Sequence, residues 1–455
     1  MTHSRNYRTL RRLIMPALAG SALAALAFAP TFGAKQVQAN VPAQSISAPK
    51  VDMPKADVPR PDDVKTGEIN EQTPHKEANP STFTGTSVIS ESKTFEHQRF
   101  DNTTSDQNAF ISKNKATITI DSSVFDKTGN TTNDDNSNFR GQNAVVLGIE
   151  GSQTSIKDSN ITSNSIGSNA VFATGEGSVI NVENTNIHTK GDSSRGLDAT
   201  YKGTVNGKNL TITTEGAHSA TLATDRGEGT ITAEAAKLTT SGTGSPVIYS
   251  TGNITANNVN GVANKSEIGV VEGKNSITLT NSNVTGYHDN GFMLYQSFSG
   301  DAESGIARLK AENNTLTTHG TGAFIYVNNT TAEADLIGNT ILMPNTTTLV
   351  KAAADSRWGK DSENGGHLTL RASNQELSGN IVADSISTIA IDMVNGSSLV
   401  GAINTDNTAK EVTLKLSKDS TWTLTGDSYV KSLTNEDTTG ENIHLNGYKL
   451  VVADK

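Results

Sequence analysis

Two segments of this chain have similar sequences: NAVVLGIEGSQTSIKDSNIT begins at Asn143, and NAVFATGEGSVINVENTNIHT begins at Asn169. Both phrases open alike, carry a Gly-Ser pair in the middle and close on Asn-Ile. Related openings recur with spacings, counted from Asn143, of 26, 26, 24, 26, 22, 23 and 31 residues. Such a period indicates one small structural unit per repeat, stacked on its neighbours. The openings begin at Asn108, Asn143, Asn169, Arg195, Ser219, Ser245, Glu267, Asn290 and Thr321.

A second pattern marks the end of each repeat. An apolar residue recurs at Val124, Ile161, Ile187, Leu210, Leu238, Val284, Leu316, Ile341 and Leu377, with Gly261 in one repeat. Three positions earlier stand Asp121, Asp158, Asn184, Gly207, Ala235, Asn258, Asn281, Asn313, Gly338 and Asn374. All but one are Asn, Asp or Gly, the residue types that tolerate a left-handed backbone. This predicts a tight bend in every repeat, with Ala235 as the exception.

Strand-like alternation fills the space between these markers, as in SVINVEN, LTITT and SITLTNSN. Short strands joined by bends at this period predict an all-β fold, a right-handed parallel β-helix. Only 34% of residues are hydrophobic, which fits a narrow core shared by many coils. A helical solenoid would need long amphipathic helices, and a propeller would need about 40 residues per repeat.

Composition divides the chain into four segments. Residues 1–39 combine an Arg-rich start, an apolar run and Val37-Gln38-Ala39, which predicts a secretory signal peptide. Residues 40–95 hold seven of the eleven prolines and are predicted to be a disordered linker. The β-helix is expected over 96–409. Residues 410–455 keep strand alternation but lose both markers, so we predict a C-terminal β cap there.

Several classes of function are disfavoured. The net charge is −10, whereas nucleic-acid binding needs clustered Lys and Arg. With no cysteine there is no thiolate metal site. The chain has no phosphate-binding loop, dinucleotide fingerprint or His-rich metal motif, so no cofactor or metal is expected.

The irregular coils, such as NAVFATGEGSVINVENTNIHTKG, and the terminal phrase Trp422-Thr-Leu-Thr-Gly-Asp-Ser428 resemble the passenger domains of pertactin-like autotransporter adhesins. The resemblance covers about residues 100–455 and implies a secreted or bacterial cell-surface protein, with a periplasmic location as the alternative. It implies binding to a host surface or glycan, or contact between cells. The chain departs from that family in lacking its C-terminal membrane barrel, so a separate outer-membrane translocator is an expected partner.

Parallel β-helices also include polysaccharide lyases and glycoside hydrolases, which use clustered carboxylates. The nearest clusters in the sequence are Asp134-Asp135, Asn404-Thr-Asp406 and His288-Asp289. The first reads as a polar loop, the second as a chance match and the third as a turn. We therefore expect an adhesin-like protein with no catalytic residues rather than an enzyme. A polysaccharide-cleaving enzyme on this fold, and a structural surface spacer, are the alternatives.

Two repeats are interrupted at the same register, by QSFSGDAESG from Gln296 and by DSRWGKDSENGG from Asp355. Equal register predicts that both loops leave the same corner of the rod, their bases about 10 Å apart. Loops on a repeat scaffold commonly carry function. Phe298, Arg357, Trp358 and Lys360 combine aromatic area with positive charge and are the predicted binding residues. The alternative is that both loops are tolerated insertions whose aromatic side chains pack on the rod.

Overall fold

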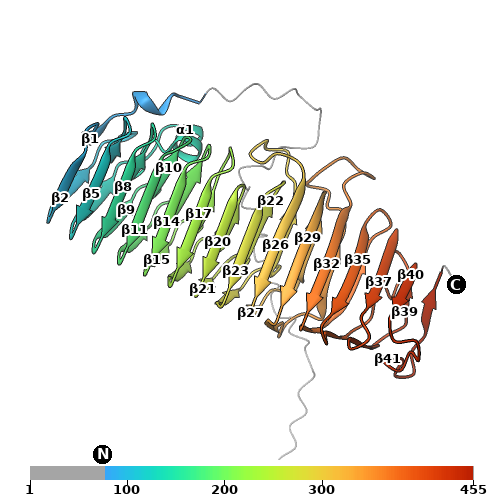
Figure 1. Ribbon diagram of the computed structural model, residues 1–455. Helices are drawn as coiled ribbons and strands as arrows, with labels where there is room; N and C mark the ends of the chain where they lie inside the picture. Colours follow the sequence, from blue (N-terminus) through green and yellow to red (C-terminus); the bar gives the residue numbers. More distant parts are fainter. Residues whose placement is uncertain (1–76, 454–455) are drawn as a thin grey trace, which may run out of the picture. The chain divides into compact units, whose positions relative to one another are not determined.

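The structure, a computed structural model, describes residues 77–453, and these form a parallel β-solenoid of about 15 turns (Figure 1). Every strand pairing within the three long sheets is parallel and joins one coil to the next. The predicted fold class is confirmed. The signal peptide and residues 40–76 of the predicted linker lie outside the described residues.

Three long sheets run along the solenoid. Sheet A contains β1 (Gly85–Ile89), β4 (Asn108–Ser112), β7 (Val146–Gly148), β10 (Val171–Thr174), β13 (Leu197–Thr200), β16 (Leu222–Thr224), β19 (Ile248–Ser250), β22 (Gly269–Glu272), β25 (Phe292–Tyr295), β28 (Ala323–Asn328), β31 (Thr348–Ala352) and β34 (Asn380–Ala383). Sheet B contains β2 (Lys93–Glu96), β5 (Thr117–Asp121), β8 (Gln153–Lys157), β11 (Val179–Glu183), β14 (Thr204–Lys208), β17 (Thr230–Glu234), β20 (Asn253–Asn257), β23 (Ser276–Thr280), β26 (Ile306–Glu312), β29 (Thr330–Ile337), β32 (Gly366–Ser373), β35 (Thr388–Val394), β37 (Glu411–Leu416) and β40 (Ser432–Asn435).

Sheet C contains β3 (Arg99–Asn102), β6 (Val124–Thr128), β9 (Asn160–Asn164), β12 (Asn186–Thr189), β15 (Thr211–Thr214), β18 (Lys237–Thr240), β21 (Asn260–Ala263), β24 (Asn283–Gly286), β27 (Thr315–Thr318) and β30 (Thr340–Leu342). Two short sheets follow, formed by β33 (Glu376–Ser378), β36 (Ser398–Val400), β38 (Thr421–Thr423) and β41 (Ile443–His444), and by β39 (Ser428–Val430) and β42 (Leu450–Val452). The described helices are a 3-10 turn, η1 (Pro80–Thr82), and α1 (Asp134–Arg140).

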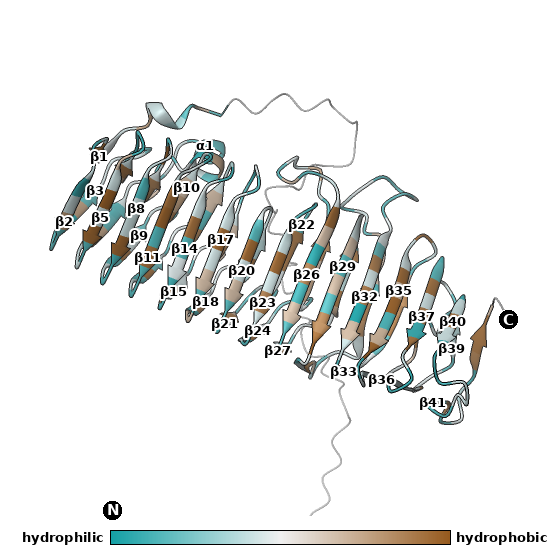
Figure 2. Ribbon diagram, viewed as in Figure 1, coloured by the Kyte–Doolittle hydropathy of each residue, from teal (hydrophilic) through white to brown (hydrophobic). Residues whose placement is uncertain are grey.

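Aliphatic side chains form columns inside the solenoid. In sheet B, one column runs from coil to coil through Ile180, Val205, Ile231, Ile254, Ile277 and Leu309, each paired with the next in register. All six are buried. Within each strand their immediate neighbours are less buried, and Figure 2 shows hydrophobic and hydrophilic residues mixed along the strands. Burying such a side chain stabilises the fold by about 1.5–3 kcal/mol. The column therefore holds neighbouring coils together and fixes their register.

The predicted bend is present between sheets B and C. Asp158, Asn184 and Asn281 have φ values of 51°, 49° and 52°, in the left-handed region. Ala235 also adopts this conformation, with φ of 55°, although it lacks the side chain that favours it. The bend is therefore set by the coil geometry, and Ala235 is forced into it.

Four assigned positions were wrong by one or two residues. The first bend lies at Ser122 rather than Asp121, and Phe125, not Val124, is in register with Ile161. In a later coil the bend lies at Asn209, and Ile212 takes the place expected for Leu210. Gly207 instead belongs to β14, where a Cβ atom would come within 2.7 Å of the Leu210 side chain. Leu210 fills the volume that this glycine leaves empty.

Polar side chains cross-link successive bends. At several bends, the residue after the bend offers a side-chain oxygen to a backbone N–H of the previous coil, as when Ser123 N donates to Ser159 Oγ at 3.0 Å. Further along, Asn314 N donates to Asn339 Oδ1 at 3.0 Å and Asn339 N donates to Gln375 Oε1 at 2.8 Å. Buried backbone donors at the bends are thus satisfied by the next coil.

Both predicted boundaries of the β-helix need correction. Sheets A and B already include β1, which lies inside the predicted linker, and β2, which begins there. The segment predicted as a cap, 410–455, continues parallel pairing, because β37 pairs with β35 and β40 pairs with β37. The apolar alternation of β37 was sufficient to continue sheet B although both sequence markers had ended.

We predict that Ala235→Asn stabilises the solenoid by about 1 kcal/mol, because the left-handed region costs an ordinary L-residue about 1–2 kcal/mol. An asparagine at this bend would also extend the amide stack in which Asn209 Nδ2 donates to Asn184 Oδ1. Urea unfolding followed by circular dichroism would measure the change. Asn258→Ala, at the next bend, should lose a similar amount, and an unchanged midpoint in both variants would contradict the explanation.

Candidate functional site

Sheet A differs from the other sheets because both of its faces are covered. Strands β10, β13 and β25 are buried at every position, whereas β11 and β12 alternate. Two small apolar clusters lie apart from the main core, and side chains from outside the coils belong to them. Phe83 joins one cluster, and Trp358 joins the other. The chain before β1, helix α1 and two loops thus cover the outer face of sheet A.

Helix α1 replaces the polar loop that we expected around Asp134-Asp135. The Asn133 side chain caps its N-terminus by accepting from Asn136 N, and Gly141 ends it at φ 75°. Asp134 and Asp135 lie in the first turn, where negative charge is favourable. Near its C-terminus, Phe139 is buried, and its carbonyl oxygen accepts from the Thr200 hydroxyl at 2.9 Å.

Both interrupting loops follow strands of sheet A, so they leave the same side of the solenoid, as their equal register predicted. The first follows β25 and the second follows β31, with β28 between them. The Trp358 ring lies 5.5 Å from the Tyr295 ring, centroid to centroid, and Asn329 Nδ2 donates to Gln296 O at 2.7 Å. The loops are therefore attached to the rod by specific contacts.

Of the four predicted binding residues, three lie at the surface and one is buried. Trp358 is only 1% exposed and packs in the cluster with Tyr295 and Tyr326, so its prediction as a contact residue was wrong. Its large apolar area is used to seat the loop. Phe298 is 52% exposed. Arg357 forms an ion pair with Asp355 at 2.9 Å, and Lys360 forms one with Glu363 at 2.6 Å.

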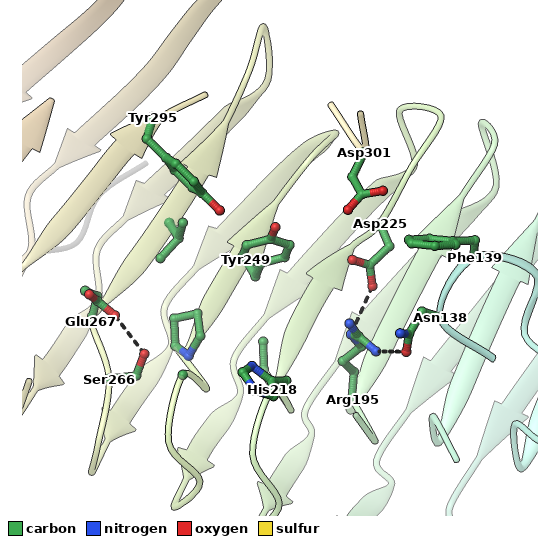
Figure 3. Close-up of a pocket in the computed structure, with 14 residues that line it drawn as sticks. Asn138, Phe139, Arg195, His218, Asp225, Tyr249, Ser266, Glu267, Tyr295 and Asp301 are labelled. Carbon is green, nitrogen blue, oxygen red and sulfur yellow. Dashed lines mark hydrogen bonds and ion pairs between the residues drawn. The ribbon is translucent and has the colours of Figure 1, made fainter. Parts of the chain in front are cut away.

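A pocket of about 100 Å³ lies on the outer face of sheet A, between α1 and the first loop (Figure 3). Polar groups and aromatic rings are distributed along it. In Figure 3, one end is lined by Asn138, Phe139, Arg195, Asp225 and Asp301, the middle by His218 and Tyr249, and the other end by Ser266, Glu267 and Tyr295. The pocket therefore combines acceptors, donors and aromatic surface.

An ion pair defines the first end. Arg195 Nε lies 2.9 Å from an Asp225 carboxylate oxygen, and Arg195 Nη1 donates to Asn138 Oδ1 at 2.7 Å. Asp198, fully buried beneath them, lies 3.8 Å from Arg195. Burial, followed by the charge of Asp225, raises the pKa of Asp198 well above its ordinary value. Burial likewise raises the pKa of Asp225, although Arg195 opposes this effect.

At the other end of the pocket, one carboxylate oxygen has no hydrogen-bond donor. Glu267 is 3% exposed, and its Oε2 accepts from the Ser266 hydroxyl at 2.8 Å. Its second oxygen, Oε1, is buried without a hydrogen-bond partner. A buried carboxylate oxygen normally has a donor. Because Glu267 lines the pocket, a bound ligand is the natural source of that donor.

Glu272 ties the first loop to the pocket. This buried carboxylate accepts from the Tyr249 hydroxyl at 2.8 Å, the Tyr295 hydroxyl at 3.0 Å and Ser297 N at 3.3 Å. Burial raises its pKa, and the hydrogen bonds from Ser297 and Tyr249 oppose this effect. The arrangement fixes both tyrosine rings and the start of the loop together.

This site was not predicted from the sequence. The clusters considered in the sequence were of adjacent or nearly adjacent residues, whereas Asp225, Glu267 and Asp301 reach the pocket from different coils and from a loop. A usable signal was present in the repeat openings. The coil beginning at Arg195 reads Arg-Gly-Leu-Asp, which places Asp198 where the coils on either side carry Phe172 and Ala223.

No protein-family model matches the chain, and no curated protein matches it. Across residues 77–453, no helix is long and apolar enough to span a membrane. Within the same part of the chain, no three His, Asp or Glu side chains are grouped so that they could hold a metal ion.

We predict that Asp198→Asn becomes more stable relative to the wild type as the pH rises. A carboxyl group whose pKa is raised by folding contributes most stability below its unfolded pKa of about 3.9, and loses it as pH rises through the folded pKa. Melting curves at pH 4 and pH 8 test this, with a relative gain of at least about 2 °C at pH 8, the change that roughly 1 kcal/mol produces. The exposed Asp406→Asn is the matched control, and the same trend in both variants would contradict the explanation.

Proposed function

We propose that this protein is an extracellular, adhesin-like β-solenoid that binds a glycan in the pocket on sheet A. The observation that carries the proposal is the buried oxygen without a donor on Glu267, a residue that lines the pocket together with aromatic rings. Sugars present hydroxyl groups that donate to carboxylates, and C–H faces that pack on rings. A pocket with a few convergent polar groups and apolar walls is the usual form of a ligand site.

The charges of the pocket favour hydroxyl groups over anionic groups. Asp225, Glu267 and Asp301 all line it, while the guanidinium of Arg195 is already engaged by Asp225 and Asn138. An anionic group placed among these carboxylates would be repelled. A neutral face of a sugar, donating to Glu267 and stacking on Tyr249 or Tyr295, avoids that repulsion. The volume of about 100 Å³ suits one sugar residue or a chain end rather than a polysaccharide lying lengthwise.

The wider role that we propose rests on sequence features. The signal peptide expected at 1–39 supports export, and the coils resemble pertactin-like passenger domains. Secretion or display on a bacterial surface, with a separate outer-membrane translocator, fits both features. A host surface, a glycan or a neighbouring cell would then be the partner, and the rod would hold the pocket away from its attachment point.

We predict that Glu267→Gln weakens glycan binding by at least about tenfold, because a hydrogen bond to a charged group contributes about 1.5–3 kcal/mol. A glycan array would identify the ligand, and calorimetry would then compare affinities. Glu234→Gln, an exposed change of the same kind on sheet B, is the matched control and should bind like the wild type. If both variants bind the glycan with equal affinity, the pocket is not the glycan-binding site.

A polysaccharide-cleaving enzyme is the second candidate, favoured by the buried Asp198 and Asp225. Burial raises the pKa of both carboxyl groups, and this is the direction that a general acid requires. The two functions differ in one measurable outcome. Release of reducing or unsaturated sugars by the wild type, abolished in Asp225→Asn, would establish catalysis; binding without release supports the adhesin-like role.

A further inference from the structure

Glu77 occupies a complete carboxylate-binding site beside the pocket. Arg140 Nε lies 2.7 Å from Glu77 Oε2, the Tyr201 hydroxyl donates to the same oxygen, and Arg226 Nη1 donates to Oε1. The Glu77 side chain is only 7% exposed. Burial would raise its pKa, but the donors Tyr201 and Arg226, together with the charge of Arg140, hold the pKa below its ordinary value. The bound group is thus an anion.

The three donors are held in place by contacts that do not involve Glu77. The Arg140 guanidinium lies 3.6 Å from the centroid of the Tyr201 ring, and the Arg226 guanidinium lies 3.8 Å from that of Phe139. Arg226 also forms an ion pair with Asp301. Guanidinium groups stacked on rings are pre-organised for bidentate recognition of carboxylates. The site would therefore keep its form if Glu77 withdrew.

Glu77 itself is attached less firmly than its partners. Residues 77–79 belong to no strand or helix of the solenoid, and the backbone contact next to Glu77 is a hydrogen bond from Ala78 N to Asn136 Oδ1 at 2.8 Å. The Arg140, Tyr201 and Arg226 side chains, in contrast, come from helix α1 and the coils. An exchange of ligands at this site needs only the first described residues to move.

We infer that Arg140, Tyr201 and Arg226 form a subsite for the carboxylate of a hexuronate sugar, which Glu77 fills as an internal substitute. The choice of a sugar acid rests on the proposed glycan-binding function, because the subsite adjoins that pocket: Arg226 contacts Phe139 and Asp301, and both line it. The acidic pocket would take the hydroxyl groups, and the arginines would take the carboxylate. A tethered competitor acts at an effective concentration of about millimolar, so the internal carboxylate weakens binding of the external one.

The test uses the full chain and a panel of hexuronate oligosaccharides, each matched with its carboxyl-reduced neutral form. Glu77→Ala should bind at least one acid tenfold more tightly than the wild type does, and should prefer it to its neutral partner. Adding Tyr201→Phe or Arg140→Gln to Glu77→Ala should remove that preference, and the preference should shrink with salt. Circular dichroism and melting curves establish that each variant is folded.

The outcomes separate this inference from the proposed function. If Glu77→Ala binds acids and their neutral forms equally, the carboxylate subsite is wrong while glycan binding stands. If the preference survives Tyr201→Phe and Arg140→Gln, the carboxylate binds elsewhere and the inference is also wrong. If neither the wild type nor Glu77→Ala binds any sugar of the panel or the array, both proposals fail.

Discussion

The structure depends on parallel hydrogen bonding between coils that remain in register. Each strand of a long sheet takes its partners from the coils before and after it, so no coil is complete alone. The register between coils is fixed by side chains that occupy the same position in each successive coil. The aliphatic column through Ile180, Val205 and Ile231 would point outward after a slip of one residue. The polar cross-links at the bends add a second constraint at a different corner.

Much of this could be read from the sequence, because the bend and the column impose local rules. A left-handed bend selects Asn, Asp or Gly, and alternation selects the inward residue, so Asp158, Asn184 and Ile187 were placed correctly. The errors arose where a residue that resembled a bend marker had a different role in packing. Gly207 resembled a bend residue, but it serves to admit Leu210, and the true bend lies at Asn209. The end of the fold was misplaced because β37 keeps the alternation without the bend signature.

The candidate site could not be predicted in the same way, because it depends on what covers sheet A. The inward face of each coil follows a repeat, whereas the cover is built from non-repeating insertions. Trp358 shows the difficulty: a loop tryptophan beside an arginine resembles a contact residue, yet it is the anchor of its loop. Conversely, nothing in the sequence distinguished Asp225 and Glu267 from ordinary polar residues. They line a pocket only because of where α1 and the first loop lie. Charged residues within the repeat openings were the one local signal.

The contact between Glu77 and Arg226 has a mechanical consequence. These residues are 149 positions apart, and Arg226 lies several coils beyond β1. A pulling force applied to the chain before Glu77 is delivered first to α1 and to the coil that holds Arg226. The exposed edge of the first coil, where a solenoid would otherwise peel strand by strand, carries load only after that clasp has opened. The ion pairs of Glu77 therefore open before the hydrogen bonds of the first strand are loaded.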